Sequence, residues 1–171
     1  MKKLQKVLLS LLALMMILCV PQFAIAASAE ETQEDTAGRE ERNFNRSWKF
    51  VRRDEENAMQ ADYNDNNWYN VGLPHDFSIP YYQETKHYTG IGWYRKEFSL
   101  SAAELEKTIK LEFDGVFHTI DLYVNGQHVM HHKGGYTGFE CNITDYVQEG
   151  NNVLAARVSN IWDPELAPPF R

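Results

Sequence analysis

The chain has 171 residues, and its 24 acidic side chains outnumber 17 Lys and Arg, which gives a formal net charge of −7 at pH 7. Nucleic acid is bound by basic surfaces, so it is not an expected partner of this acidic chain. Hydrophobic residues make up 43% of the sequence, which is enough apolar mass for a single folded core.

The first 26 residues have the organisation of a secretory signal peptide. Three lysines within residues 2–6 precede a nearly continuous apolar run over residues 7–20. The segment Ala24–Ala26 fits the small-x-small cleavage rule, so we expect cleavage after Ala26 and a secreted or periplasmic protein. The run is shorter than the about 20 residues of a membrane span. A retained membrane anchor is the alternative, and a lipoprotein anchored through Cys19 is less favoured. After cleavage we expect no membrane association.

Residues 27–43 are expected to form a disordered acidic spacer. The segment is rich in Glu, Gln, Thr and Ala and has almost no aliphatic or aromatic side chain. It therefore cannot bury enough apolar surface to offset the entropy lost on ordering. Signal cleavage would remove three basic residues and no acidic one, which changes the formal net charge from −7 to −10.

Residues 44–171 show the period-two alternation of strands that bury one face. Turn signals such as Asp114-Gly115 separate these runs, and helical patterns are limited to short turns at Ser101–Leu105 and Thr144–Val147. Short strands with regular turns indicate an all-β sandwich or jelly roll. We expect these residues to face inward: Ile109, Leu111, Phe113, Ile120, Leu122, Val124, Val153 and Val158.

The segment 122–139 predicts a hairpin followed by an aromatic loop. Asn125-Gly126 is well suited to a two-residue type I′ turn, because both residues tolerate positive φ. Three glycines then set Tyr136 and Phe139 on a flexible rim. Polar loops with aromatic tips are the part of β-sandwich modules that binds sugars. By contrast, Asp62–Ile79 is polar and predicts a long loop, anchored by packing of Trp68.

Four segments of the chain stand in a fixed order and spacing: Trp68–Asp76, Gly90–Phe98, Leu111–Val129, and Gly134–Phe139 with Asn142–Leu154. Together they resemble the N-terminal sugar-binding domain of glycoside hydrolase family 2, the β-galactosidase and β-glucuronidase family. The resemblance covers essentially all of residues 44–171, suggests a β-galactosidase-type member and implies a jelly-roll, galactose-binding-like sandwich.

The resemblance also implies that catalysis takes place elsewhere. The family's acid/base and nucleophile glutamates lie on a separate (β/α)₈ barrel, and a retaining enzyme needs two carboxyl groups about 5 Å apart. We therefore expect no catalytic residue in this chain and no activity of the chain alone; the missing barrel is the expected partner. Residues 44–171 are also expected to lack the final strand, as in a gene fragment, a premature stop or a shortened form.

Four residues are candidates for sugar contact. The resemblance implies that an aspartate just after the penultimate strand reaches the active site, and Asp163 stands at the matching offset. An ordinary turn-forming aspartate before Pro164 is the alternative. The resemblance also gives Thr89, just before Gly90-Ile91-Gly92, an active-site role. Trp162 and Tyr136 can stack on a pyranose face.

Metal, cofactor and thiol chemistry is not expected. His131 and His132 should face opposite ways on a hairpin, whereas a structural zinc site usually needs four ligands. Cys141 is the one cysteine left after cleavage and is expected to be a small core residue.

Three functions remain open on the sequence. The first is a sugar-binding domain of a secreted β-galactosidase-like hydrolase that acts in carbohydrate metabolism on a β-galactoside-type glycan. The second is a stand-alone secreted carbohydrate-binding module without catalysis. The third is a sandwich that binds protein.

Overall fold

The computed structural model describes residues 33–34, 39–79, 81, 83 and 86–163, and the chain divides into two units, residues 1–43 and 44–171. In the first unit, β1 (Gln33–Glu34) pairs antiparallel with β2 (Glu40–Glu41). The expected signal peptide and most of the expected spacer lie outside the described residues. Within the described part, no helix combines the length and the apolar character that a membrane crossing requires.

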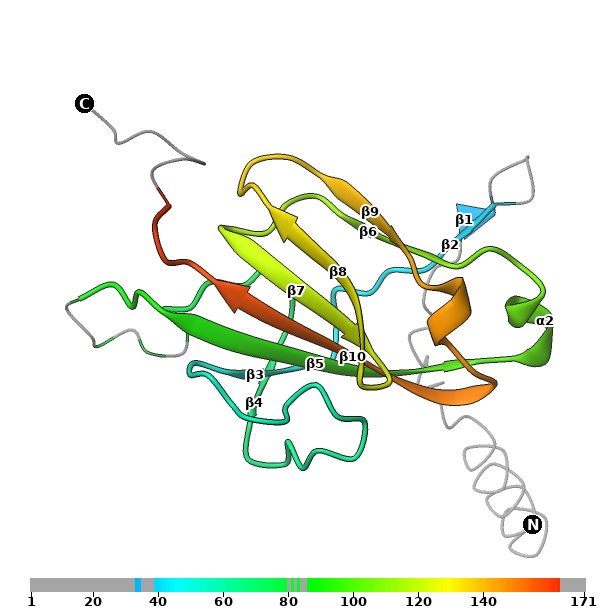
Figure 1. Cartoon of the computed structure of the whole chain (residues 1–171), viewed down its shortest axis with the longest axis horizontal. Coiled ribbons are helices and arrows are strands. Elements are labelled where there is room, and N and C mark those ends of the chain that lie inside the picture. The colour runs from blue at the N-terminus through cyan, green and yellow to red at the C-terminus, as the bar shows by residue number, and fades with distance from the viewer. Residues whose placement is uncertain (1–32, 35–38, 80, 82, 84–85, 164–171) are drawn as a thin grey trace, which may run out of the picture. The chain divides into compact units, whose positions relative to one another are not determined.

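The second unit is an antiparallel β-sandwich, which confirms the predicted all-β fold (Figure 1). Its large sheet has the strand order β4-β3-β5-β10-β7-β8, and a smaller sheet pairs β6 with β9. The large sheet consists of β3 (Trp48–Val51), β4 (Tyr69–Val71), β5 (Ile91–Leu100), β7 (Thr119–Val124), β8 (Gln127–Lys133) and β10 (Gly150–Ser159). The small sheet consists of β6 (Lys110–Phe113) and β9 (Phe139–Asn142).

Among the described residues of the second unit, helical structure is limited to two short turns, as the sequence predicts. The helix α2 (Ala102–Leu105) is capped by Ser101, whose hydroxyl accepts a hydrogen bond from the backbone N–H of Glu104 in a capping box. The 3₁₀ turn η1 (Thr144–Tyr146) follows β9. Both turns connect strands and leave the sandwich as the main structural feature.

The core lies between the two sheets and follows the predicted alternation on most strands. On β7, Ile120, Leu122 and Val124 are all buried, at 2% exposure or less. The small sheet contributes Leu111 and Cys141 to the same cluster, so Cys141 is a core residue as expected. Ile109 and Phe113 are partly buried against this cluster, as is Phe98 from β5. Together these contacts form the interior of the sandwich.

The predicted inward position of Val153 is wrong. On β10 the inward row is formed by Leu154, Ala156 and Val158, whereas Ala155 packs on the outer face. Side chains alternate along a strand, so residues five positions apart, such as Val153 and Val158, must face opposite ways. Arg157, four residues after Val153 and therefore on the same face, marks this phase.

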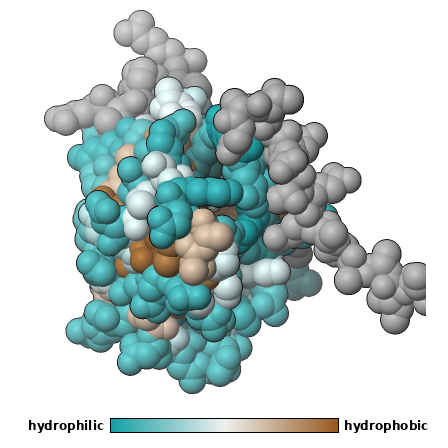
Figure 2. All heavy atoms as spheres, turned by 90° about the vertical axis from the view of Figure 1, so that its right-hand side faces the viewer, coloured by the Kyte–Doolittle hydropathy of each residue, from teal (hydrophilic) through white to brown (hydrophobic). Residues whose placement is uncertain are grey.

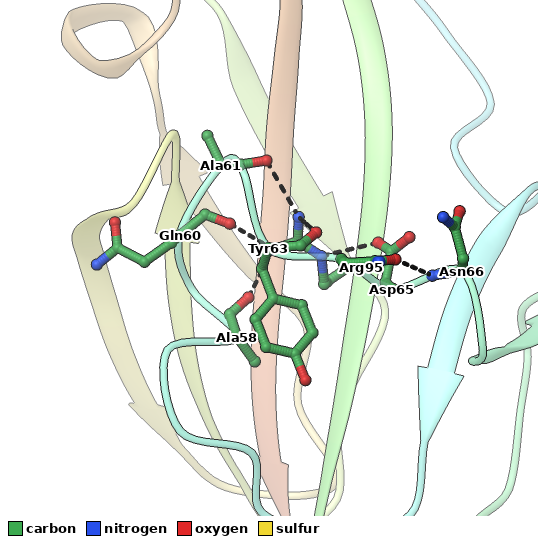
Figure 3. Close-up of polar contacts among 8 residues, drawn as sticks. Ala58, Gln60, Ala61, Tyr63, Asp65, Asn66 and Arg95 are labelled. Carbon is green, nitrogen blue, oxygen red and sulfur yellow. Dashed lines mark hydrogen bonds and ion pairs between the residues drawn. The ribbon is translucent and has the colours of Figure 1, made fainter.

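The outer face of the large sheet is partly covered by the segment 52–68. A second, smaller apolar cluster there contains Trp68 and Trp93, so Trp68 is packed as expected. The buried guanidinium of Arg95 on β5 binds this segment through its backbone carbonyls and Asp65 (Figure 3). Within the predicted loop Asp62–Ile79, the structure adds β4, which pairs with β3. Three mostly exposed residues carry too little periodicity to reveal such a strand.

The predicted hairpin between β7 and β8 is confirmed. Asn125 and Gly126 have φ values of 51° and 84°, as a type I′ turn requires. The side chain of Asn125 also donates to the carbonyl of Tyr146 and accepts from the N–H of Val153, which ties the turn to its neighbours.

Candidate functional site at one end of the sandwich

The sheet topology brings the four predicted sugar-contact residues to one end of the sandwich. Ser159, at the end of β10, pairs with Ile91 at the start of β5 and with Thr119 at the start of β7, and Thr119 also pairs with Lys133 at the end of β8. The segments beyond these strand ends therefore meet at the left of Figure 1. We call the segments 88–90, 115–118, 134–138 and 160–163 the site end; they contain Thr89, Tyr136, Trp162 and Asp163.

Asn160 fixes two of these segments to each other. Its side chain accepts a hydrogen bond from the N–H of Gly90 at 2.8 Å and donates to the carbonyl of Tyr88 at 2.7 Å. Its own backbone N–H donates to the carbonyl of Gly90 at 3.1 Å. The exposed Thr89 is thereby held close to the segment that carries Trp162. Asn160 is not among the residues predicted from the sequence, because an Asn after a strand has no signal beyond its polarity.

Exposed aromatic side chains gather at the site end. Tyr136 is 71% exposed, and Phe117 and Trp162 are each 39% exposed. The rings of Phe117 and Tyr136 lie 5.8 Å apart in an edge-on arrangement. Gly135 permits this packing, because a Cβ atom there would lie 2.4 Å from Cδ2 of Phe117. The opposite end, shown in Figure 2, is largely hydrophilic, with apolar side chains scattered among the hydrophilic ones.

Two histidines lie inside this aromatic rim. His118 is 1% exposed, and its ring centroid lies 6.1 Å from that of Trp162. His132 stacks on Phe139 with a centroid distance of 4.0 Å. Among the described residues, neither ring nitrogen of His118 has a hydrogen-bond partner, nor does Nε2 of His132. From the sequence, His132 was considered only as a metal ligand, and His118 was not among the candidates.

Asp163 lies at the site end, one residue after Trp162, and is half-buried. The structure thus places all four candidates in adjoining segments. A role of Asp163, Thr89, Trp162 or Tyr136 in sugar contact stays a prediction, as does the alternative that Asp163 only forms a turn.

Two further histidines, His128 and His131, lie on the outer face, away from His132. His128 and His131 both approach Oδ1 of Asp121, at 3.2 and 2.7 Å, while His132 points inward. The opposite directions of His131 and His132 are therefore as predicted. A bulge opposite Leu122 and Tyr123 brings His128 and His131 to one face. Within the described ranges, no group of three or more metal-ligating side chains is placed to hold an ion.

The outer face also carries an open cleft of about 570 Å³ beside Asp54 and Arg157. Arg157 Nε and Trp93 Nε1 both donate to Oδ1 of Asp54 at 2.9 Å. The hydrogen bond from Arg157 is the main reason why the pKa of Asp54 lies below its ordinary value. Because these polar groups already satisfy one another across segment 52–68 and two strands, we interpret them as holding that segment in place.

Comparison with known proteins shows one consistent family. Residues 41–167 match the family described as "Glycosyl hydrolases family 2, sugar binding domain". A β-galactosidase of Thermoanaerobacter pseudethanolicus is 36% identical over 77% of this chain and 18% of its own length. A putative β-glucuronidase of Formosa agariphila is 35% identical over 75% of this chain and 13% of its own length.

Solved structures show the same likeness. The crystal structure of a Bacteroides uniformis β-glucuronidase superposes with a TM-score of 0.68 and 34% identity, and the match covers 75% of this chain and 15% of that protein. The chain thus spans less than one fifth of the length of these relatives.

Proposed function

This chain belongs to glycoside hydrolase family 2 and matches the sugar-binding domain of that family. We propose that it is the sugar-binding domain of a secreted β-galactosidase-like enzyme. In this proposal the whole enzyme hydrolyses O-glycosyl bonds of β-galactoside-type glycans in carbohydrate metabolism. The β-galactosidases among the relatives support this choice of substrate, including one from Bacteroides ovatus that is 37% identical. The apolar run and cleavage motif within residues 1–26 support secretion.

The observation that carries the proposal is the meeting of aromatic and polar side chains at the site end. Trp162 and Tyr136 offer exposed rings that complement the C–H groups of a pyranose face. Asp163 supplies a carboxylate and Thr89 a hydroxyl, which can accept and donate hydrogen bonds to sugar hydroxyls. We infer that these four residues contact the glycan.

The catalytic carboxylates are assigned to a barrel domain that packs against the site end. A retaining glycosidase needs an acid/base and a nucleophile carboxyl about 5 Å apart, flanking one glycosidic bond. In our proposal the barrel supplies both, while this domain holds the sugar beside them and needs no cofactor. The exposed aromatic rim would be covered in that arrangement.

The test uses the chain together with the whole reading frame that follows its last codon in the gene. We expect this protein to hydrolyse nitrophenyl β-galactoside faster than nitrophenyl β-glucuronide. Loss of one stacking ring, in Trp162→Ala or Tyr136→Ala, should raise KM about three- to tenfold. Lys110→Ala, on the exposed face of β6, is the control and should leave KM unchanged. Unchanged KM in both aromatic variants would contradict the proposed site.

One observation favours the alternative of a stand-alone carbohydrate-binding module. The whole aromatic rim is built by this chain, with Phe117, Tyr136 and Trp162 all contributed by the site end. In that case the chain alone should bind an oligosaccharide with a dissociation constant in the micromolar range, and the following reading frame should encode no barrel.

A further inference from the structure

We propose that His118 is a further glycan-binding residue, whose imidazole forms a polar floor behind Trp162 and binds a hydroxyl group of a neutral pyranose. The inference rests on the proposed function, because it concerns the same end of the sandwich. It adds a buried residue to the four candidates at the site end.

The backbone fixes the position of His118. Its N–H donates to the carbonyl of Ser159 at 2.8 Å, and its carbonyl accepts from the N–H of Gly134 at 3.1 Å. These bonds extend the pairing of β7 with β10 and β8 by one residue. His118 therefore continues the inward row of Ile120 and Leu122, and its ring is buried at the mouth of the sandwich.

The imidazole of His118 is not explained by packing. The other inward residues of β7 are aliphatic and form the core. Within the described part of the chain, both Nδ1 and Nε2 of His118 are enclosed and unpaired. A buried polar group without a partner destabilises a fold, so its presence calls for an explanation such as a binding role.

A second imidazole adjoins this position. His132 pairs across the strands with Ile120, two residues along from His118, and also points inward. Its Nε2 is likewise enclosed and has no partner among the described residues. Two unpaired imidazoles occupy neighbouring inward positions, so chance packing of a single side chain does not explain them. They mark the mouth of the sandwich, behind the exposed rings, as polar.

The chemistry of this arrangement suits an uncharged sugar. A neutral imidazole donates from one nitrogen and accepts at the other, and a sugar hydroxyl does both. The ring of Trp162 lies over His118 and can stack on the same pyranose after a side-chain movement. The carboxylate of Asp163 on this rim disfavours an anionic sugar such as a glucuronide.

The test follows the ring nitrogens of the histidines by nuclear magnetic resonance while methyl β-D-galactopyranoside is added to the purified chain. We expect the nitrogens of His118 to shift. His118→Phe keeps an aromatic ring and removes both nitrogens, so it should weaken binding about three- to tenfold. The same variant should unfold at an equal or higher urea concentration, since it removes an unpaired polar group. If His118 has only a structural role, His118→Phe should leave binding unchanged and should unfold at a lower urea concentration.

His131→Phe is the matched control, because His131 lies on the outer face beside Asp121 and should not affect binding. If Trp162→Ala weakens binding but His118→Phe does not, the inference is wrong and the proposed function stands. If neither variant weakens binding, or no resonance shifts, both are contradicted. An equal response to methyl β-D-glucuronide would overturn the stated preference for neutral sugars.

Discussion

Arg95 and Asp65 form a largely buried ion pair between β5 and the segment that covers the outer face of the large sheet. Nε of Arg95 donates to Oδ2 of Asp65 at 2.8 Å, and the Arg95 side chain is only 2% exposed. Nη1 and Nη2 also donate to four backbone carbonyls, at distances from 2.6 to 3.4 Å (Figure 3). These belong to Ala58, Gln60, Ala61 and Tyr63. One guanidinium thus holds most of a polar segment that has no regular secondary structure.

Removal of this guanidinium should be strongly destabilising. Arg95→Ala leaves Asp65 and several carbonyls without their partner, and we expect a loss of about 3–5 kcal/mol in the free energy of unfolding measured with urea. Arg95→Lys should not restore the loss, because an ammonium cannot reproduce the planar fork. Lys110→Ala breaks the exposed pair with Glu140 and should change stability by about 0.5 kcal/mol or less. Equal effects of Arg95→Ala and Lys110→Ala would contradict this role.

A cavity among the inward-facing residues of β7 should lower the free energy of unfolding. Leu122 is 1% exposed, so Leu122→Ala should lower the free energy of unfolding by about 2–5 kcal/mol. Glu112→Ala, on an exposed face of β6, is expected to stay within about 0.5 kcal/mol of the parent. Val153→Ala tests the strand phase on β10 and should cost clearly less than Leu122→Ala. A Val153→Ala cost as large as that of Leu122→Ala would refute the register described here.

Gly92 should not tolerate a side chain. A Cβ atom at this position would lie 2.8 Å from the ring of Phe77 and 2.9 Å from that of Phe50. Gly92→Ala therefore overpacks the core, and we expect a loss of about 1–3 kcal/mol in chemical unfolding. Gly72→Ala is the matched control, since its nearest neighbour would be the carbonyl oxygen of Asn45 at 3.5 Å. If both alanine variants are equally stable, the close packing around Gly92 is not present in solution.

Acid should weaken the contribution of Asp54 to stability. The hydrogen bond from Arg157 keeps the pKa of Asp54 below its usual value of 3.8, against the opposing effect of partial burial. A carboxyl group with a lower pKa in the folded state stabilises the fold above its unfolded-state pKa. It loses that contribution as the pH falls through the folded-state pKa.

The difference in unfolding free energy between the parent and Asp54→Asn should therefore be largest above about pH 5 and should shrink below about pH 4. Urea titrations at a series of pH values measure it. A difference that grows toward acid pH would mean that Asp54 is not stabilised by Arg157.

Most of the fold was predictable from local patterns. The alternation of apolar and polar residues on β7 and the Asn125-Gly126 turn both depend on neighbouring residues. The period of the pattern and the turn preferences of Asn and Gly were therefore enough to predict this hairpin. The phase of β10 is marked in the sequence only by Arg157, one charged residue within an otherwise apolar run, and the predicted inward position of Val153 conflicts with it. The short strand β4 forms only because β3 offers it a partner.

The candidate site was predictable in part. Tyr136 stands out among glycines, and Trp162 follows a strand pattern, so both were found as exposed aromatics. Asp163 and Thr89 came from the family resemblance, and their roles stay predictions. His118 and Asn160 were missed, because their positions have meaning only once β5, β7, β8 and β10 are aligned at one end.

The most direct test of the central claim is a map of the backbone amides that shift when methyl β-D-galactopyranoside is added to the chain. We predict weak binding, with shifts concentrated in residues 88–90, 117–118, 134–136 and 160–163. Shifts centred instead on Asp54 and Arg157 in the outer cleft, or no shifts at all, would contradict the assignment of the glycan to the site end.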